Sequence, residues 1–121
     1  MKIKNFETKV VAVPRDEGPL TGGMGNKAEF VTIKINTEDG LTGIGYAGFV
    51  SSLMIKALKE SVDALLQSIV GMDPRNVELI NKHLRDLAGG GAPAGLVTRS
   101  VSAIDVALWD LKGKQSGEPV H

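Results

Sequence analysis

The sequence has 121 residues, and its 14 basic and 14 acidic side chains give a formal net charge of zero at pH 7. A neutral chain with 4% aromatic residues lacks both the basic surface and the stacking residues that bind nucleic acid. The absence of cysteine excludes disulfides, thiolate metal sites and a cysteine nucleophile. Because 42% of the residues are hydrophobic, no long apolar run occurs and the N-terminus is polar, we expect one globular cytoplasmic domain with neither a secretory leader nor a membrane partner.

The N-terminal part of the chain has the alternating pattern of β-strands. Apolar residues scattered through residues 1–13 predict an extended segment, and the glycine- and proline-rich residues 14–27 predict a long surface loop. Residues 28–37 and 41–47 alternate apolar and polar side chains with a period of two. The Glu-Asp-Gly sequence at residues 38–40 suits a tight turn that needs a positive φ. We therefore predict three antiparallel strands.

After Ser51 the apolar period changes to three and four, which indicates helices. The first helix should end at Gly71. A second helix should open at Asp73-Pro74, with Asp73 as the capping side chain and Pro74 at the first helical position, and should end at glycines 89–91. The predicted apolar stripes are Ile55, Leu58, Val62, Leu65, Leu66 and Ile69 in the first helix, and Val77, Ile80, Leu84 and Leu87 in the second.

A third helix is predicted from about Arg99 to Gln115, followed by the stop signals Gly117 and Pro119. Its apolar stripe consists of Val101, Ile104, Leu108 and Leu111. Strands that come first and helices that follow indicate an α+β fold rather than the alternation of a parallel α/β domain. The sequence therefore predicts a three-stranded antiparallel sheet followed by a three-helix bundle that lies against one face of the sheet.

Two glycine-rich stretches resemble phosphate-binding motifs. Gly43–Gly48 matches G-x-G-x-x-G, and Asp63 lies about 20 residues beyond the first glycine. A dinucleotide site needs a parallel strand after the helix with the acidic residue at its end, whereas Asp63 falls within a predicted helix. Residues 22–25 would offer a nest of backbone N–H groups but lack the Gly-Lys-Ser/Thr ending of a P-loop. We interpret the first stretch as a glycine-rich strand and the second as a mobile loop.

The remaining polar residues do not form a recognisable catalytic set. His83 and His121 belong to no zinc-binding pattern, and His83 lies at the edge of a helix stripe, where a partly buried structural imidazole is expected. Asp105 and Asp110 are too far apart along a helix to converge as an i, i+4 pair, so we interpret both as structural. Four serines lack the Gly-x-Ser-x-Gly pattern of a nucleophile elbow, namely Ser51, Ser52, Ser100 and Ser102. We therefore predict no catalytic residue and no metal ligand in this chain.

The predicted third helix resembles a family signature. Residues 102–114 read Ser-Ala-Ile-Asp-Val-Ala-Leu-Trp-Asp-Leu-Lys-Gly-Lys and residues 117–121 read Gly-Glu-Pro-Val-His, which is similar to the mandelate racemase/muconate lactonizing enzymes of the enolase superfamily. Residues 40–46 and 71–74 resemble that family's third strand and its turn into the second helix. The resemblance covers residues 1–121 and implies an enolase-like N-terminal capping domain.

The resemblance also implies that the catalytic machinery lies elsewhere. In this family the magnesium-binding acidic residues, the catalytic lysines and the His-Asp pair stand on a TIM barrel of about 200 residues or more, which is expected downstream of this chain. The chain alone should therefore be inactive, and Mg and a carboxylate or acid-sugar substrate should bind only with the barrel. Two cap loops shape the family's substrate pocket, and they correspond here to Pro19–Lys27 and Gly48–Ser51. The expected pocket residues are Pro19, Leu20, Thr21, Gly22, Gly23, Met24, Gly25, Gly48, Phe49, Val50 and Ser51.

The family's reaction is proton abstraction α to a carboxylate, which gives lyases and isomerases. The glycine-rich residues 89–95 before the signature resemble the acid-sugar dehydratases more than the racemases. The alternative is a self-standing, non-catalytic module that binds a separate partner or itself. Because a barrel would cover part of the helical bundle, an isolated cap should expose an apolar patch and form homo-oligomers. A domain of this length can bury its own core, so folding without the barrel is expected.

Overall fold

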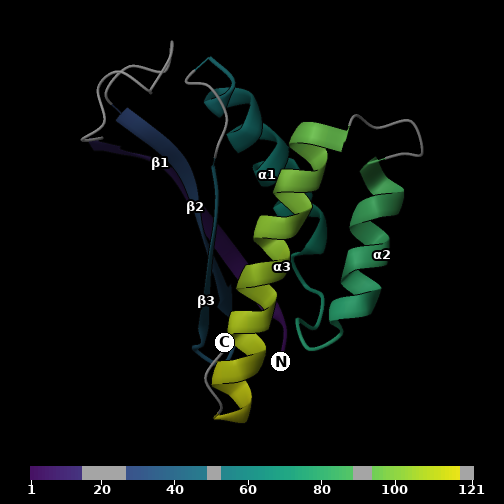
Figure 1. The fold of residues 1–121 in the computed structure, drawn as a ribbon. Helices are drawn as coiled ribbons and strands as arrows, with labels where there is room; N and C mark the ends of the chain where they lie inside the picture. Colours follow the sequence, from purple (N-terminus) through teal and green to yellow (C-terminus); the bar gives the residue numbers. More distant parts are fainter. Residues whose placement is uncertain (15–26, 49–52, 89–93, 118–121) are drawn as a thin grey trace.

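Three strands followed by three helices form the protein in a computed structural model whose described residues are 1–14, 27–48, 53–88 and 94–117 (Figure 1). The strands are β1 (Ile3–Pro14), β2 (Lys27–Thr37) and β3 (Thr42–Ala47), and the helices are α1 (Ile55–Ile69), α2 (Val77–Ala88) and α3 (Ala94–Ser116). This order and the antiparallel pairing of the strands confirm the predicted α+β fold. No helix within the described ranges is long and apolar enough to cross a membrane.

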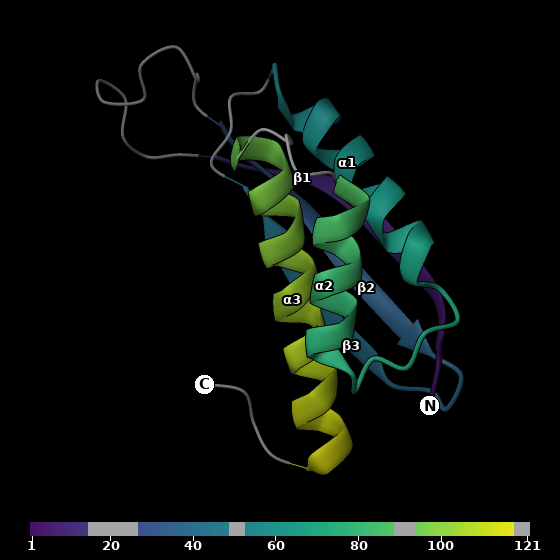
Figure 2. The ribbon, with the colours of Figure 1, turned by 90° about the vertical axis from the view of Figure 1, so that its right-hand side faces the viewer.

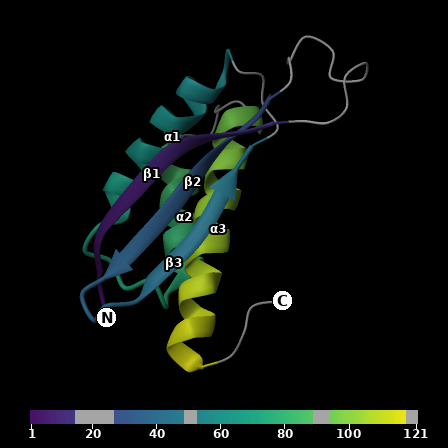
Figure 3. The same ribbon diagram turned by 90° about the vertical axis from the view of Figure 1, so that its left-hand side faces the viewer.

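The sheet has the order β1-β2-β3, with β2 in the centre and antiparallel to both neighbours. Every second residue of β2 is buried beneath the helices, at Val31, Ile33 and Ile35, because successive side chains of a strand point to opposite faces. Figures 2 and 3 show this covered face and the open face opposite. The predicted turn between β2 and β3 also forms: Gly40 has φ +91°, and its N–H donates to the Thr37 carbonyl oxygen at 3.2 Å.

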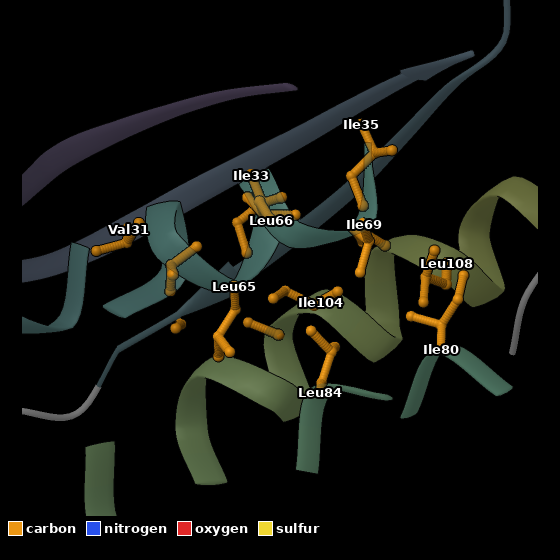
Figure 4. Packing of buried hydrophobic residues seen from close by; sticks show 14 of the residues in the cluster. Val31, Ile33, Ile35, Leu65, Leu66, Ile69, Ile80, Leu84, Ile104 and Leu108 are labelled. Carbon is orange, nitrogen blue, oxygen red and sulfur yellow. The ribbon is translucent and has the colours of Figure 1, made fainter. Parts of the chain in front are cut away.

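The hydrophobic core lies between the sheet and the helices and continues between the helices themselves. α1 and α3 contact the sheet, whereas α2 packs against α1 and α3. Figure 4 shows apolar side chains from β2 and all three helices meeting in one cluster. Both long stripes are confirmed: the six predicted residues of α1 are buried, as are Ile104, Leu108 and Leu111 of α3, and Val101 packs partly buried against them.

The predicted start of α2 is wrong, and the reason is the turn that precedes it. The Asp73 carboxylate accepts the backbone N–H of Arg75 at 2.9 Å, so it closes a local Asx turn instead of capping a helix. α2 begins only at Val77. Pro74 therefore lies in the turn and not at the first helical position.

Two further predictions about the helices need correction. Leu87 is 54% exposed, because it lies at the flank of the α2 stripe, in the last turn, rather than at its centre. α3 begins at Ala94 instead of Arg99. Leu96 packs partly buried against the core, and its carbonyl oxygen accepts the Ser100 hydroxyl at 2.8 Å. These contacts extend the helix by five residues beyond its predicted start.

Candidate functional site

The candidate site is the end of the sheet from which the two predicted pocket loops depart. Pro14, the last residue of β1, pairs with Lys27, the first of β2, so the first loop joins neighbouring strand ends. Ala47, the last residue of β3, pairs with Val31 in the same half of β2. Both loops therefore start at one end of the sheet (Figure 1). Among the predicted pocket residues Gly48 is described, whereas 19–25 and 49–51 lie outside the described residues.

Gly48 is held from two sides. Its carbonyl oxygen accepts a hydrogen bond from Arg99 Nη1 of α3 at 2.8 Å. A Cβ at Gly48 would overlap the ring of Phe30, which packs edge-to-face against Tyr46 with 6.2 Å between ring centroids. The residue that opens the second predicted loop is thus fixed by side chains distant in sequence. Sequence reasoning missed Arg99, because a contact between residues 51 apart leaves no local pattern.

The G-x-G-x-x-G stretch serves packing rather than phosphate binding. Gly43 and Gly45 lie where α3 crosses β3, and a Cβ on them would overlap the backbone carbonyl oxygens of Ala107 and Ala103, respectively. Close approach of a helix backbone to a strand demands glycine at these positions. Asp63 stands within α1 and accepts the Thr8 hydroxyl from β1. The interpretation as a glycine-rich strand is therefore confirmed.

Both aspartates of α3 attach the helix to its neighbours. Asp110 Oδ2 accepts the backbone N–H of Ile44 at 2.9 Å, on the free edge of β3, and forms an ion pair with Lys114 at 3.0 Å. Asp105 Oδ1 accepts a hydrogen bond from Asn81 of α2 at 2.9 Å. Pairing of an exposed strand edge with helix side chains also limits edge-to-edge association. Asp105 and Asp110 thus join α3 to α2 and to β3, respectively.

His83 and Ser100, which carry side chains able to take part in catalysis, also have structural partners. His83 is partly buried, and its Nε2 lies 3.3 Å from Ser68 Oγ of α1. Ser100 is fully buried and bonds within its own helix, whereas Ser102 is exposed. In the part of the chain that the structure describes, no three His, Asp or Glu side chains gather to hold a metal ion. The described residues therefore offer no set of ligands that fits a magnesium ion. His121, Ser51 and Ser52, which were also considered in the sequence, lie outside the described residues.

An open groove of about 530 Å³ runs between the start of α2 and the outer side of α3. At its rim, Arg75 binds both carboxylate oxygens of Asp73, with Nη2 to Oδ2 at 2.7 Å. Hydrogen bonding to the Arg75 guanidinium is the main cause that lowers the pKa of Asp73 from 3.8 to about 2. On the other wall, Lys112 Nζ lies 4.6 Å from the centroid of the Trp109 ring, in cation–π contact. Each of the two cations is thus engaged within the chain.

Comparison with known proteins identifies one family and several reactions. The family described as mandelate racemase / muconate lactonizing enzyme, N-terminal domain, matches residues 5–121. A D-mannonate dehydratase from Caulobacter vibrioides is 37% identical over 93 residues, which are 76% of this chain and 22% of that protein. A hydrophobic dipeptide epimerase from Enterococcus faecalis is 29% identical over 125 residues, which are 100% of this chain and 34% of that protein.

The fold agrees with the sequence comparison. The crystal structure of an enolase from Bradyrhizobium, complexed with magnesium and mandelic acid, superposes with a TM-score of 0.83 at 25% identity, over 96% of this chain and 32% of that one. This chain thus spans 22% of the length of the D-mannonate dehydratase and about a third of the other two proteins. Because the family match covers nearly every residue and the fold is shared, the chain belongs to the mandelate racemase/muconate lactonizing enzyme family and represents its N-terminal domain.

Proposed function

We propose that this chain is the cap of a cytoplasmic, Mg-dependent lyase or isomerase of the enolase superfamily, and that a catalytic TIM barrel follows it in the complete protein. The observation that carries the proposal is the match of an N-terminal-domain family to residues 5–121. This chain covers only 22% of the D-mannonate dehydratase and 34% of the dipeptide epimerase, which supports the proposal that the complete protein is larger. The barrel supplies the metal and the acid–base groups, and this chain, inactive alone, completes the pocket.

The cap acts on the pocket through the end of the sheet where the loops depart. Pro19 to Gly25 and Gly48 to Ser51 are proposed to close over the mouth of the barrel and to contact the substrate. Support comes from the Pro14–Lys27 pairing and from the Arg99–Gly48 hydrogen bond, which bring the loop starts to one end of the domain. Closed loops exclude water from a charged intermediate and so favour its formation.

The substrate is proposed to be a carboxylate, with an acid sugar favoured over a dipeptide. The relatives of higher identity, at 37% and 41%, are a D-mannonate dehydratase and a member of the D-galactonate dehydratase family, whereas the dipeptide epimerase is 29% identical. Proton abstraction α to the carboxylate would be common to dehydration and epimerisation. The reaction in the complete enzyme is therefore proposed to be dehydration of an acid sugar, with racemisation or epimerisation as the other outcome.

The test uses the protein encoded by the complete reading frame. With Mg²⁺ and a panel of acid sugars and dipeptides in ²H₂O, the complete protein should remove the proton α to the carboxylate of at least one substrate. The removal is seen either as ²H exchanged into that substrate or as loss of water to form a 2-keto acid. Keto-acid formation would then identify a dehydratase. The 121-residue chain alone should show no exchange. Exchange or keto-acid formation by the isolated chain, or neither by the complete protein with any acid, would contradict the proposal.

The role of the loops is tested in the same enzyme. Replacing residues 19–25 by a Gly-Ser linker of equal length should lower kcat/KM by about 10- to 100-fold, because the pocket is left open to water and the substrate misplaced. A matched control replaces the exposed ion pair Lys82–Asp86 of α2, far from these loops in the sequence, and should leave kcat/KM unchanged. Equal effects of the two replacements would argue against a pocket role for the loop.

The alternative function is a self-standing module without a barrel. The observation that favours it is the exposure of large apolar side chains on this chain, among them Leu79, Val106 and Trp109, since such patches mark interaction surfaces. In this case the chain would form homo-oligomers. A reading frame that stops after residue 121 and a concentration-dependent oligomer in sedimentation would favour the module over the cap.

A further inference from the structure

Within the described residues, three side chains of α3 form hydrogen bonds with the backbone of β3 or of the residue that follows it. The bonds join Lys114 Nζ to the Thr42 carbonyl oxygen at 2.7 Å, the Ile44 N–H to Asp110 Oδ2 at 2.9 Å, and Arg99 Nη1 to the Gly48 carbonyl oxygen at 2.8 Å. The first two lie within β3 and attach the helix to this edge strand. The third lies beyond Ala47, the last residue of β3, so attachment of the strand does not account for it.

The donor of this third bond stands on a fixed part of α3. Ser100, the next residue, is completely buried, and its hydroxyl donates to the Leu96 carbonyl oxygen at 2.8 Å. Its Oγ also lies 3.0 Å from Ser61 Oγ of α1. Arg99 itself is exposed and lines, together with Gly48, the groove of about 330 Å³ between α3 and β3. A charged donor on a rigid helix forms a strong hydrogen bond and can hold its acceptor in a defined place.

The acceptor is a peptide group that directs the chain out of the sheet. The Gly48 carbonyl belongs to the planar peptide group between Gly48 and the next residue, so a hydrogen bond to its oxygen fixes the orientation of that group. Gly48 is buried, and the Phe30 ring occupies the space that a side chain would need. Because a buried carbonyl oxygen is costly to leave unpaired, the bond to Arg99 also stabilises this backbone position.

We propose that Arg99 is a positioning residue for the substrate, an inference that rests on the proposed function. Arg99 acts through Gly48: by holding the carbonyl oxygen of this residue, it sets the position from which the second pocket loop begins. Loss of the hydrogen bond then weakens the contacts between that loop and the acid sugar, whereas the groups that react are unchanged. An interaction that contributes equally to binding of the substrate and of the transition state affects KM rather than kcat.

The first experiment measures kcat and KM of the complete enzyme with the substrate that the panel identifies. Arg99→Met removes the donor and should raise KM by about tenfold or more, with kcat changed less than about twofold. Arg99→Lys retains the charge and an N–H donor and should keep KM within about threefold of the natural enzyme. A side chain needed only for folding would instead lower the amount of active enzyme, and hence the apparent kcat, without changing KM.

Arg75→Met is the matched control. Arg75 also forms a hydrogen bond within the chain, through Nη2 to Asp73 at 2.7 Å, but it lies before α2, at the opposite end of the domain from the start of the two loops (Figure 1). The same substitution there removes the same charge and should leave both kcat and KM within about twofold. Circular dichroism melting of the three variants verifies that each is folded.

The second experiment needs no activity and uses the 121-residue chain. Gly48–Phe49 is the only Gly-Phe pair in the sequence, so labelling with [1-¹³C]glycine and [¹⁵N]phenylalanine gives a single carbonyl–amide correlation from the peptide group that Arg99 binds. Loss of the donor in Arg99→Met should shift the carbonyl resonance of Gly48. The shift should be smaller in Arg99→Lys and absent in Arg75→Met.

The outcomes separate this inference from the proposed function. A shifted carbonyl resonance together with a raised KM in Arg99→Met would support the inference. If the resonance shifts but KM stays within twofold, or rises equally in Arg75→Met, the cap function stands and the positioning role is wrong. An unmoved resonance would show that the hydrogen bond is absent and would overturn the inference whatever the kinetics. If the complete protein removes no proton from any acid, the proposed function itself falls, and the positioning role falls with it.

Discussion

The two sides of α3 perform different tasks with neighbouring residues. On the inner side the helix lies so close to β3 that Gly43 and Gly45 have no room for a side chain, and Leu108 is completely buried. On the outer side, two residues before Leu108, Val106 is half exposed. The inner side therefore determines whether the chain folds, whereas the outer side contributes little to its stability. A helix with this division can hold a domain together and present a surface to another domain.

Removing a core side chain from the inner side should produce the largest effect. Leu108→Ala should lower the free energy of unfolding by about 2–5 kcal/mol, because it leaves a cavity in a packed core. Val106→Ala, on the outer side of the same helix, should change it by no more than about 0.5 kcal/mol. Urea unfolding followed by far-UV circular dichroism measures both values. Similar losses in the two variants would refute the division between the two sides of α3.

Adding a methyl group to Gly45, where β3 crosses α3, tests how tightly the inner side of α3 is packed. Gly45→Ala should cost about 1–3 kcal/mol, because the new Cβ meets the backbone of α3, which cannot move without the helix. Gly95→Ala is the control, since Gly95 lies in the first turn of α3 with open space around it. That substitution should stabilise the chain by up to about 1 kcal/mol. Thermal unfolding should show shifts of opposite sign, and equal shifts would contradict the close approach.

Removing the hydrogen bond between Asp110 of α3 and the edge of β3 should have a smaller effect on the free energy of unfolding. Asp110→Ala removes the acceptor of the Ile44 N–H and should cost about 1–2 kcal/mol. Asp86→Ala removes only an exposed ion pair with Lys82 and should cost no more than about 0.5 kcal/mol. Amide hydrogen exchange provides a local readout, because the Ile44 N–H should exchange faster in Asp110→Ala alone. Unchanged protection of that amide would show that Asp110 does not hold the edge.

The smallest effect on the free energy of unfolding is expected when the surface ion pair Asp73–Arg75, at the rim of the groove, is broken. The pKa of Asp73 is lowered from 3.8 to about 2, so the pair stabilises the fold fully above about pH 4 and loses this contribution as the pH falls through about 2. The stability difference between the natural chain and Asp73→Asn should therefore be constant above pH 4 and shrink below it. A carboxyl ¹³C titration of Asp73 with a midpoint near 3.8 would contradict the interaction.

The periodic parts of the fold could be predicted from the sequence because their signal is local. The alternation in β2 and the stripe of α1 give both the element and the buried face, and the structure confirms them residue by residue. The start of α2 could not be predicted in the same way. Asp73 hydrogen-bonds the N–H two residues ahead, and a helix cap and an Asx turn have the same sequence signature.

The contacts of the candidate site could not be predicted from local sequence patterns, because they join residues distant in sequence. Gly43 and Gly45 could be recognised as glycines of a strand, but the helix that excludes their side chains comes about 60 residues later, at Ala103 and Ala107. Likewise, Arg99 carries no motif that would announce its hydrogen bond to Gly48. The outer stripe of α3 can be read from the spacing of Val106 and Trp109, yet only the three-dimensional arrangement shows that nothing in the described residues covers it.

The most direct test of the cap function is the mass of the complex formed when the separately produced chain and the C-terminal domain of its gene are mixed. Sedimentation velocity should show one species with the summed mass of the 12.8 kDa chain and one C-terminal domain, formed at equimolar concentration. Two independent species from the natural chain, or an oligomer of the chain alone that excludes the C-terminal domain, would contradict the function proposed here.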